Sequence, residues 1–180
     1  MRLLPSATEV ISPWNDFSKI PPGVLQYASE RGTLVHDVCL NFHAKGLPFI
    51  GTVQDDAKGY IASFDNWFER MVAEVILVEE RLFDEANGYS GQIDLLVMTK
   101  QGEIWMPDLK TPLVKSKAWR VQIAAYRNLC CLKGYEPKRS GSLQLSPDGS
   151  LAKMNWYEGS AAQDFNIFLH CLNAYRYFQA

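Results

Sequence analysis

Two aspartates and a lysine, Asp94, Asp108 and Lys110, lie inside the two apolar strands expected within the stretch GQIDLLVMTKQGEIWMPDLKTP (residues 91–112). Asp108 and Lys110 are two residues apart, so on a strand their side chains point to the same face of the sheet. If the two apolar segments pair as a hairpin, Asp94 lies on the neighbouring strand within reach of both. Two carboxylates in a partly buried site repel each other, and a divalent cation bound through oxygen atoms removes that cost. The pattern therefore favours a Mg²⁺ or Mn²⁺ site, with Lys110 as a positive charge that orients a water molecule or a phosphate oxygen.

The surroundings of these charges bear on whether they form a site or a solvated surface. Taken alone, a D-x-K sequence in a strand is more typical of a solvated face or a surface ion pair. Here the neighbours of the charged residues are apolar, and they are Ile93, Leu95, Leu96, Ile104, Trp105 and Leu109. Pro107 cannot donate a ladder hydrogen bond, which indicates a sheet edge or a bulge beside Asp108. The context therefore favours a site.

His36, in the segment RGTLVHDV, is a candidate third ligand. A lone histidine on a mostly apolar helix is more often a structural group, and the sequence contains no zinc-binding pattern. His43 lies about two helical turns further on, ~10 Å along the axis, so the two imidazoles are not expected to bind one ion. His36 can nevertheless complete a carboxylate site, because imidazole is a ready ligand for Mn²⁺.

Two further pairs of residues belong to the same hypothesis. Gln122 and Tyr126, four residues apart in VQIAAYRNL, share one face of an expected helix. This pair fits ordinary amphipathic packing, and it also fits an amide and a phenol that steady Lys110, a water molecule or a nucleic-acid strand. Glu79 and Glu80 are candidates for additional contacts to a metal or a water molecule, and one of them is expected to face solvent.

The elements that must position these residues follow from apolar spacing and turn residues. The first twenty or so residues are expected to be irregular. Helices are predicted at about 24–44, 60–75, 116–134 and 161–178. Strands are predicted at about 75–83, 93–99, 103–111, 142–145 and 151–157. This order predicts an α/β (mixed α+β) fold, with a central mixed sheet of about five strands flanked by helices, in one domain over residues 1–180.

Bulk composition limits the classes of function. The chain has 180 residues, is 47% hydrophobic and carries a formal net charge of −2. That charge argues against a protein that holds nucleic acid mainly by overall attraction, but it allows a local basic groove or a metal site. The four cysteines form no CxxC pair, which predicts a reduced protein of the cytoplasmic type. The absence of a long apolar run near the N-terminus leads us to expect neither a signal peptide nor a membrane span.

Four short motifs follow one another along the chain: RGTLVH, GQIDLL, PDLKT and QIAAY. In this order they resemble the RecB-like branch of the PD-(D/E)XK nuclease superfamily, which includes phage and CRISPR-associated exonucleases. The matched segments extend from about Gly32 to Tyr126. The resemblance implies a restriction-endonuclease-like core around the mixed sheet.

The resemblance also implies roles for particular residues. The metal ligands, for Mg²⁺ or Mn²⁺, would be His36, Asp94, Asp108 and the backbone carbonyl of Leu109. The catalytic lysine would be Lys110, and the helix pair that follows it would be Gln122 and Tyr126. Asp108 stands where many relatives carry glutamate. Some relatives hold an iron–sulfur cluster, but their spacing is not reproduced here by Cys39, Cys130, Cys131 and Cys171, so no cluster is predicted.

The function implied is metal-dependent hydrolysis of DNA phosphodiesters, most simply by an exonuclease of recombination, repair or phage DNA metabolism. Its expected location is the cytoplasm of a bacterial cell or a phage-infected host. No G-x-x-x-x-G-K-[ST] phosphate loop occurs, so any motor would come from a helicase or recombination partner, and a homo-oligomer is a further option. Two alternatives stay open: a non-catalytic nucleic-acid-binding or assembly module with the same fold, and a structure-selective endonuclease.

Candidate contacts to DNA phosphates are Arg31, Lys115, Lys117 and Arg120. On a helix, Lys117 and Arg120 share a sector with Arg127 that lies away from Gln122 and Tyr126, which fits a solvated face better than a wall of the site. Lys115 and Lys117, just before the helix, and Arg31, near His36, are therefore the better candidates.

Overall fold

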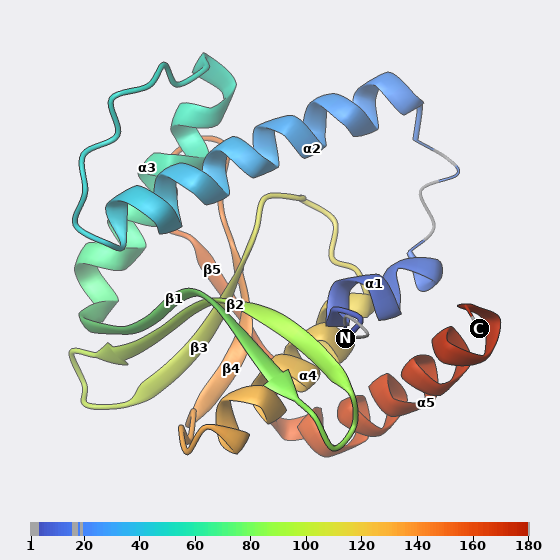
Figure 1. The fold of residues 1–180 in the computed structure, drawn as a ribbon. Helices are drawn as coiled ribbons and strands as arrows, with labels where there is room; N and C mark the ends of the chain where they lie inside the picture. The colour runs from blue at the N-terminus through green and yellow to red at the C-terminus, as the bar shows by residue number, and fades with distance from the viewer. Residues whose placement is uncertain (1–3, 16–17, 19, 180) are drawn as a thin grey trace.

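The protein is a five-stranded mixed sheet with helices on both faces, as seen in a computed structural model that describes residues 4–15, 18 and 20–179 (Figure 1). The strands lie side by side in chain order and are β1 (Val72–Asp84), β2 (Tyr89–Thr99), β3 (Ile104–Lys110), β4 (Arg139–Gln144) and β5 (Lys153–Trp156). The helices are α1 (Ala7–Ile11), α2 (Pro22–His36), α3 (Asp55–Met71), α4 (Ala118–Leu132) and α5 (Ala161–Gln179). The predicted fold class is confirmed.

One parallel pairing shapes the sheet. Neighbouring strands are antiparallel except β3 and β4, which pair in parallel from Trp105↔Arg139 to Lys110↔Gln144. Parallel neighbours need a crossover, and α4 provides it. Helix α4 therefore returns across the face of β3, where Asp108 and Lys110 project.

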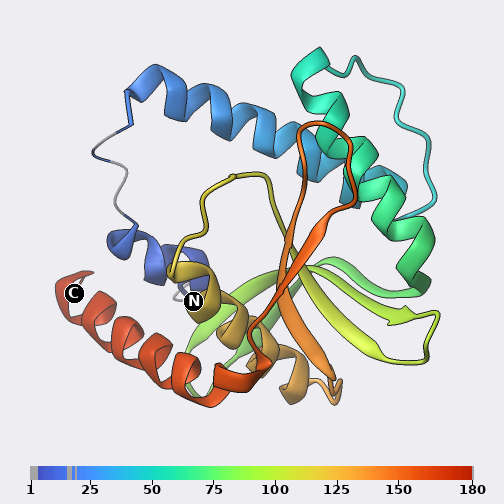
Figure 2. The ribbon, with the colours of Figure 1, turned by 180° about the vertical axis from the view of Figure 1, so that it is seen from behind.

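The helices divide between the two faces of the sheet (Figures 1 and 2). On one face, apolar residues of α1, α4 and α5 form a cluster that includes Ile11, Leu129 and Phe168. On the other face, α2 and α3 form a second cluster that includes Val35 and Phe64. Burial of each apolar stripe against the sheet holds the layers together. Within the described residues, no helix combines the length and apolar character needed to cross a membrane.

Two helical predictions need correction at the N-terminal side. The expectation of an irregular first segment is wrong for Ala7–Ile11, which form α1 behind a capping box between Ser6 and Glu9. This helix is too short for its apolar spacing to be recognised. The predicted helix 24–44 is helical as far as His43, but it changes at His36 from α2 to the π-helical segment η2 (Asp37–His43). Predictions for residues 1–3, 16–17, 19 and 180 lie outside the described residues.

Strand β1 changes the direction of its side chains at Glu79. Residues an odd number apart in an unbroken strand point to opposite faces, yet Leu77 and Leu82 pack in the same cluster. Between them, Glu79 has a left-handed φ of 52°, the only positive φ at a non-glycine residue within the described chain. A side chain in this conformation costs roughly 1–2 kcal/mol, and the kink re-aims Glu79.

Strand β2 breaks its alternation at the opposite position. Ile93 and Leu96 lie three residues apart and also share one cluster, and Asp94 lies between them. The pairings Val78↔Leu95 and Glu80↔Ile93 place Asp94 across from Glu79. Both strands are therefore irregular at the same point, where two carboxylates face each other.

Strands β2 and β3 separate soon after their hairpin. Their described pairings are Met98↔Ile104 and Val97↔Trp105, and further along the Asp94 Oδ2 atom accepts the Leu109 N–H at 2.8 Å. Of the two alternatives expected for Pro107, the sheet edge is wrong, because β3 is an inner strand and Pro107 pairs with Gly141 of β4. The irregularity expected there is the separation of β2 from β3. Proline has no backbone N–H, and this is tolerated at Pro107. Backbone groups two residues apart point to the same side of a strand, so the nitrogen of Pro107, like that of Leu109, faces the opening towards β2.

A histidine and an aspartate, His43 and Asp65, form an ion pair on the α3 side of the sheet, and its contribution to stability can be tested. The His43 Nδ1 atom lies 2.8 Å from Asp65 Oδ1, and this hydrogen bond raises the pKa of His43. A raised folded-state pKa means that the stabilisation is fully present below the unfolded value, about 6.5, and is lost as the pH rises through the folded value. Because the two side chains are 31% and 37% exposed, we expect only about 0.5 kcal/mol.

Urea unfolding between pH 5.5 and 8.5 measures this contribution. The free energy of unfolding of the native protein should exceed that of His43→Gln at the acid end, and the difference should shrink as the pH rises. The control is His170→Gln, which removes an exposed histidine of α5. A His43→Gln difference that stays constant with pH would contradict the assignment.

Candidate metal centre and lysine site

A cleft of about 850 Å³ opens between α2, η2 and the strands β1 and β3. Its wall includes His36, Glu79, the backbone of Leu109 and Lys110. These residues come from segments far apart in the sequence, so the tertiary fold alone brings them together. The cleft is the candidate functional site.

Three metal-ligating groups meet at this wall. One ligand atom each from His36, Glu79 and Asp94 lies within 4.8 Å of the others. An imidazole with two carboxylates suits Mn²⁺, and Mg²⁺ accepts the same oxygen atoms, so the residues fit the predicted cation. The Leu109 carbonyl oxygen lies 3.1 Å from His36 Nε2, beside the same group. The structure thus brings together His36, Asp94 and the Leu109 carbonyl as predicted, and adds Glu79.

Local structure explains why the side chains of the candidate metal ligands point into the cleft. His36 is the last residue of α2, where the helix passes into η2, and π-helical turns often occur at functional sites. Glu79 is turned by its left-handed φ, and its carboxylate accepts a hydrogen bond from the Gln92 side chain. Glu80, the next residue, is exposed, so the expectation that one of the two glutamates faces solvent is confirmed.

Burial controls the charges of this cluster. It raises the pKa of Asp94 well above its usual value, and repulsion from Asp108 raises it further. Burial and the nearby Lys110 charge lower the pKa of His36, so the imidazole stays neutral and can act as a ligand. A cation bound at this cluster would therefore compete with a proton for the Asp94 carboxylate.

Asp108 has a different partner from Asp94. Its Oδ2 atom lies 2.6 Å from Lys110 Nζ, and the Asp108 side chain is 3% exposed. The prediction from strand alternation is confirmed, since the two side chains share one face of β3. Within the described residues, however, the group of three close ligands contains Glu79 in place of Asp108. Asp108 as a direct metal ligand stays a prediction.

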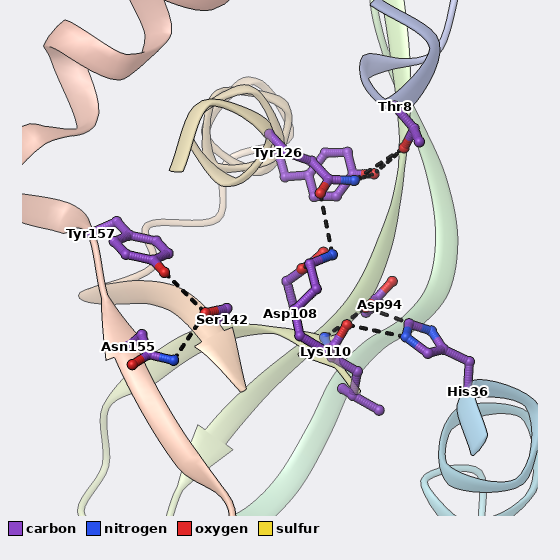
Figure 3. A network of polar contacts seen from close by, with 11 residues as sticks. Thr8, His36, Asp94, Asp108, Lys110, Tyr126, Ser142, Asn155 and Tyr157 are labelled. Carbon is purple, nitrogen blue, oxygen red and sulfur yellow. Dashed lines mark hydrogen bonds and ion pairs between the residues drawn. The ribbon is translucent and has the colours of Figure 1, made fainter. Parts of the chain in front are cut away.

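The predicted helix pair reaches the lysine. Lys110 Nζ donates to Gln122 Oε1 at 3.2 Å, and Gln122 Nε2 donates to the Tyr126 hydroxyl at 2.9 Å. Figure 3 shows Tyr126 on one side of Lys110 and His36 on the other. Of the two interpretations left open by the sequence, the contacts favour the one in which the pair steadies the lysine. Thr8 of α1, which also contacts Gln122, had no signal in the sequence.

Lys110 remains a cation in this environment. Burial alone would lower its pKa, but the charges of Asp108 and Asp94 and the hydrogen bond to Asp108 together raise it. Burial and the nearby aspartates raise the pKa of Tyr126 to about 12, so the phenol keeps its proton. The site therefore presents an ammonium donor beside two acids.

None of the predicted phosphate-binding residues lines the cleft. Arg31 is occupied, with its Nη1 atom 3.3 Å from Asp56 Oδ2 and its guanidinium carbon 5.0 Å from the centre of the Tyr60 ring. Arg120 makes two 3.2 Å contacts with Asp164 and lines a second cavity of about 490 Å³ between α1, α4 and α5. Lys117 lines that second cavity too.

Lys115 is the best placed of the predicted phosphate contacts. It is exposed, and it lies in the loop that leaves the cleft at Pro112. The cleft wall itself carries three carboxylates, Glu30, Asp37 and Glu79, against the single ammonium of Lys110. A polyanion would therefore need a bound cation to approach this wall.

Glu79 is expected to be a metal ligand, and its neighbour provides a matched control. Glu79→Gln should weaken Mn²⁺ binding by about tenfold or more, because loss of even an indirect partner of a metal site costs roughly 10–100-fold. Glu80→Gln removes the same charge from an exposed position and should leave the affinity within about twofold. Isothermal titration with Mn²⁺ measures both, and equal losses in the two variants would remove Glu79 from the site.

Metal binding should release protons. Because burial and repulsion from Asp108 raise the pKa of Asp94, a proton competes with a cation for this carboxylate, so the apparent Mn²⁺ affinity should fall as the pH is lowered. Titrations at one pH in two buffers of different ionisation enthalpy count the released protons. A binding heat that does not depend on the buffer would contradict the predicted protonation of Asp94.

Comparison with known proteins does not assign the chain to a family. No protein-family model matches it, and no curated protein matches it in sequence. The functional argument therefore depends on the residues and their geometry.

Proposed function

We propose that the protein is a metal-dependent DNA nuclease that hydrolyses phosphodiester bonds in the cleft. The observation that carries this proposal is the meeting of an imidazole and two carboxylates with a buried ammonium at one wall. A neutral histidine beside two acids and an ammonium suits a hydrolytic metal site. When bound there, a divalent cation would polarise a phosphate oxygen and lower the pKa of a water molecule.

Particular residues of the chain would bind the cation and stabilise the charge that develops during hydrolysis. His36, Glu79, Asp94 and the Leu109 carbonyl would hold the cation. Lys110 donates hydrogen bonds to the attacking water or to a phosphate oxygen as negative charge builds there. Its raised pKa favours this role over that of a general base, since it stays protonated at neutral pH.

The finer assignment follows the motif resemblance. We infer a RecB-like member of the PD-(D/E)XK superfamily with a restriction-endonuclease-like core. Two features support it: Asp94 lies on the strand beside Asp108 and Lys110, and the next helix supplies Gln122. An exonuclease of recombination, repair or phage DNA metabolism, working in the bacterial cytoplasm with or without a helicase or recombination partner, is the corresponding biological proposal.

Cleavage of labelled DNA tests the proposal. End-labelled linear and closed circular DNA are incubated with the protein in Mg²⁺, Mn²⁺ or EDTA. We expect cleavage that requires the cation and acts on the linear substrate, as for an exonuclease. Cleavage of the circle would indicate an endonuclease, and binding without cleavage under every metal would support the non-catalytic module.

Replacement of the lysine separates chemistry from metal binding. Lys110→Met should lower the cleavage rate by roughly 10²–10³-fold, the usual cost of removing a donor to a developing anion. Its Mn²⁺ affinity should be retained or increased, because a nearby positive charge is lost. Lys133→Met, at the exposed end of α4, is the matched control and should cleave normally. A Lys110→Met protein with the native cleavage rate would exclude the proposed role of Lys110.

A further inference from the structure

Helix α1 is seated firmly against the catalytic side of the sheet. Its apolar residues Ala7, Val10 and Ile11 are at most 3% exposed, and they pack in the cluster shared with α4. The backbone just before it is tied to β2, where the Ser90 N–H donates to the Pro5 carbonyl at 2.9 Å. The position of Thr8 is therefore set by the sheet and by α4 together.

The Thr8 hydroxyl lies next to the nitrogen atom of the Gln122 side-chain amide. Gln122 Nε2 donates to Thr8 Oγ1 at 3.0 Å and to the Tyr126 hydroxyl at 2.9 Å. The Thr8 and Tyr126 hydroxyls are also 3.2 Å apart. A primary amide has two N–H donors, so both are used on the side away from the lysine. Figure 3 shows Thr8 and Tyr126 together on that side.

The orientation of the Gln122 side-chain amide determines which hydrogen bonds Lys110 can make. With both N–H groups engaged, Gln122 presents its Oε1 atom to Lys110. The reversed amide would place N–H groups against an ammonium and would leave the oxygen facing two hydroxyls. An ammonium has three N–H donors, and Asp108 and Gln122 take two of them. The third has no hydrogen-bond acceptor among the described contacts, and Lys110 lines the cleft.

We propose that Thr8 is a positioning residue for Lys110: its hydroxyl, delivered by α1, fixes the orientation of the Gln122 amide and so directs the remaining N–H of the lysine into the cleft. The proposal rests on the proposed nuclease function. It extends the catalytic apparatus to a helix that lies before all four sequence motifs. Thr8 acts through Gln122 and does not itself contact substrate.

Kinetics of three variants test the positioning role. Thr8→Val keeps the shape of the side chain and removes the hydroxyl, and its kcat should fall by about tenfold, the effect of one lost hydrogen bond. The KM for DNA should stay within about twofold, because Thr8 is remote from the substrate. Thr8→Ser should restore most of kcat. Ser12→Ala, which removes a hydroxyl bonded to the Glu9 carbonyl at the end of α1, is the control and should leave kcat unchanged.

A spectroscopic measurement is independent of activity. The Gln122 side-chain amide gives two ¹H–¹⁵N signals, which are assigned by their loss in Gln122→Glu. In Thr8→Val at least one signal should shift and exchange faster with water, whereas Ser12→Ala should leave both unchanged. If Thr8→Val does not fold, Thr8→Ala takes its place, with the same expectation.

The outcomes are distinguishable. A native protein that cleaves no DNA would refute the nuclease function, and the amide signals would still decide whether Thr8 holds Gln122. An active protein in which Thr8→Val changes neither kcat nor the amide signals would overturn the positioning role. A fall in kcat with unchanged amide signals would overturn it as well, since the loss would then act by another route.

Discussion

A lysine ammonium and an aspartate carboxylate lie 2.6 Å apart with little access to water, and much of the surrounding structure satisfies this pair. Removing two charges from water costs several kcal/mol per ion, and their mutual attraction repays this only when further hydrogen bonds complete the site. Gln122 supplies one such bond, and Tyr126 and Thr8 orient Gln122. The result is a polar network inside an apolar cluster, which is costly to build without a use.

The topology of the sheet makes the network accessible. The parallel pairing of β3 and β4 requires α4 to cross back over β3, which brings Gln122 above Lys110. The early separation of β2 and β3 leaves backbone groups of β3 without ladder partners on one side. Asp94 takes the Leu109 N–H and His36 approaches the Leu109 carbonyl, so the opening in the sheet becomes the wall of the cleft. The candidate ligands are thus positioned by the places where the regular structure is interrupted.

The sequence predicted the regular parts of this arrangement. Strand alternation was enough to place Asp108 and Lys110 on one face, and helical spacing was enough to pair Gln122 with Tyr126. Both signals depend on local periodicity, which the tertiary fold preserved. The element order and the mixed sheet followed from the same patterns.

The irregular parts could not be predicted in the same way. Glu79 could be named only as one of two candidates, because its direction depends on a left-handed backbone that glutamate does not signal. Thr8 lies in a helix of five residues, which is too short to show a period. Pro107 indicated an edge or a bulge, and the edge alternative failed because a missing N–H is also tolerated where two inner strands separate. Each miss concerns a position where long-range pairing overrides local preference.

The left-handed backbone of Glu79 costs stability and at the same time directs a carboxylate towards the cleft. At φ 52° a glycine would be relaxed and a glutamate is not, so a chain chosen only for durability would place glycine at this kink. Glycine would also remove one of the three candidate ligand groups that meet at the cleft. The glutamate at this position therefore combines a strained backbone with a carboxylate at the wall of the cleft.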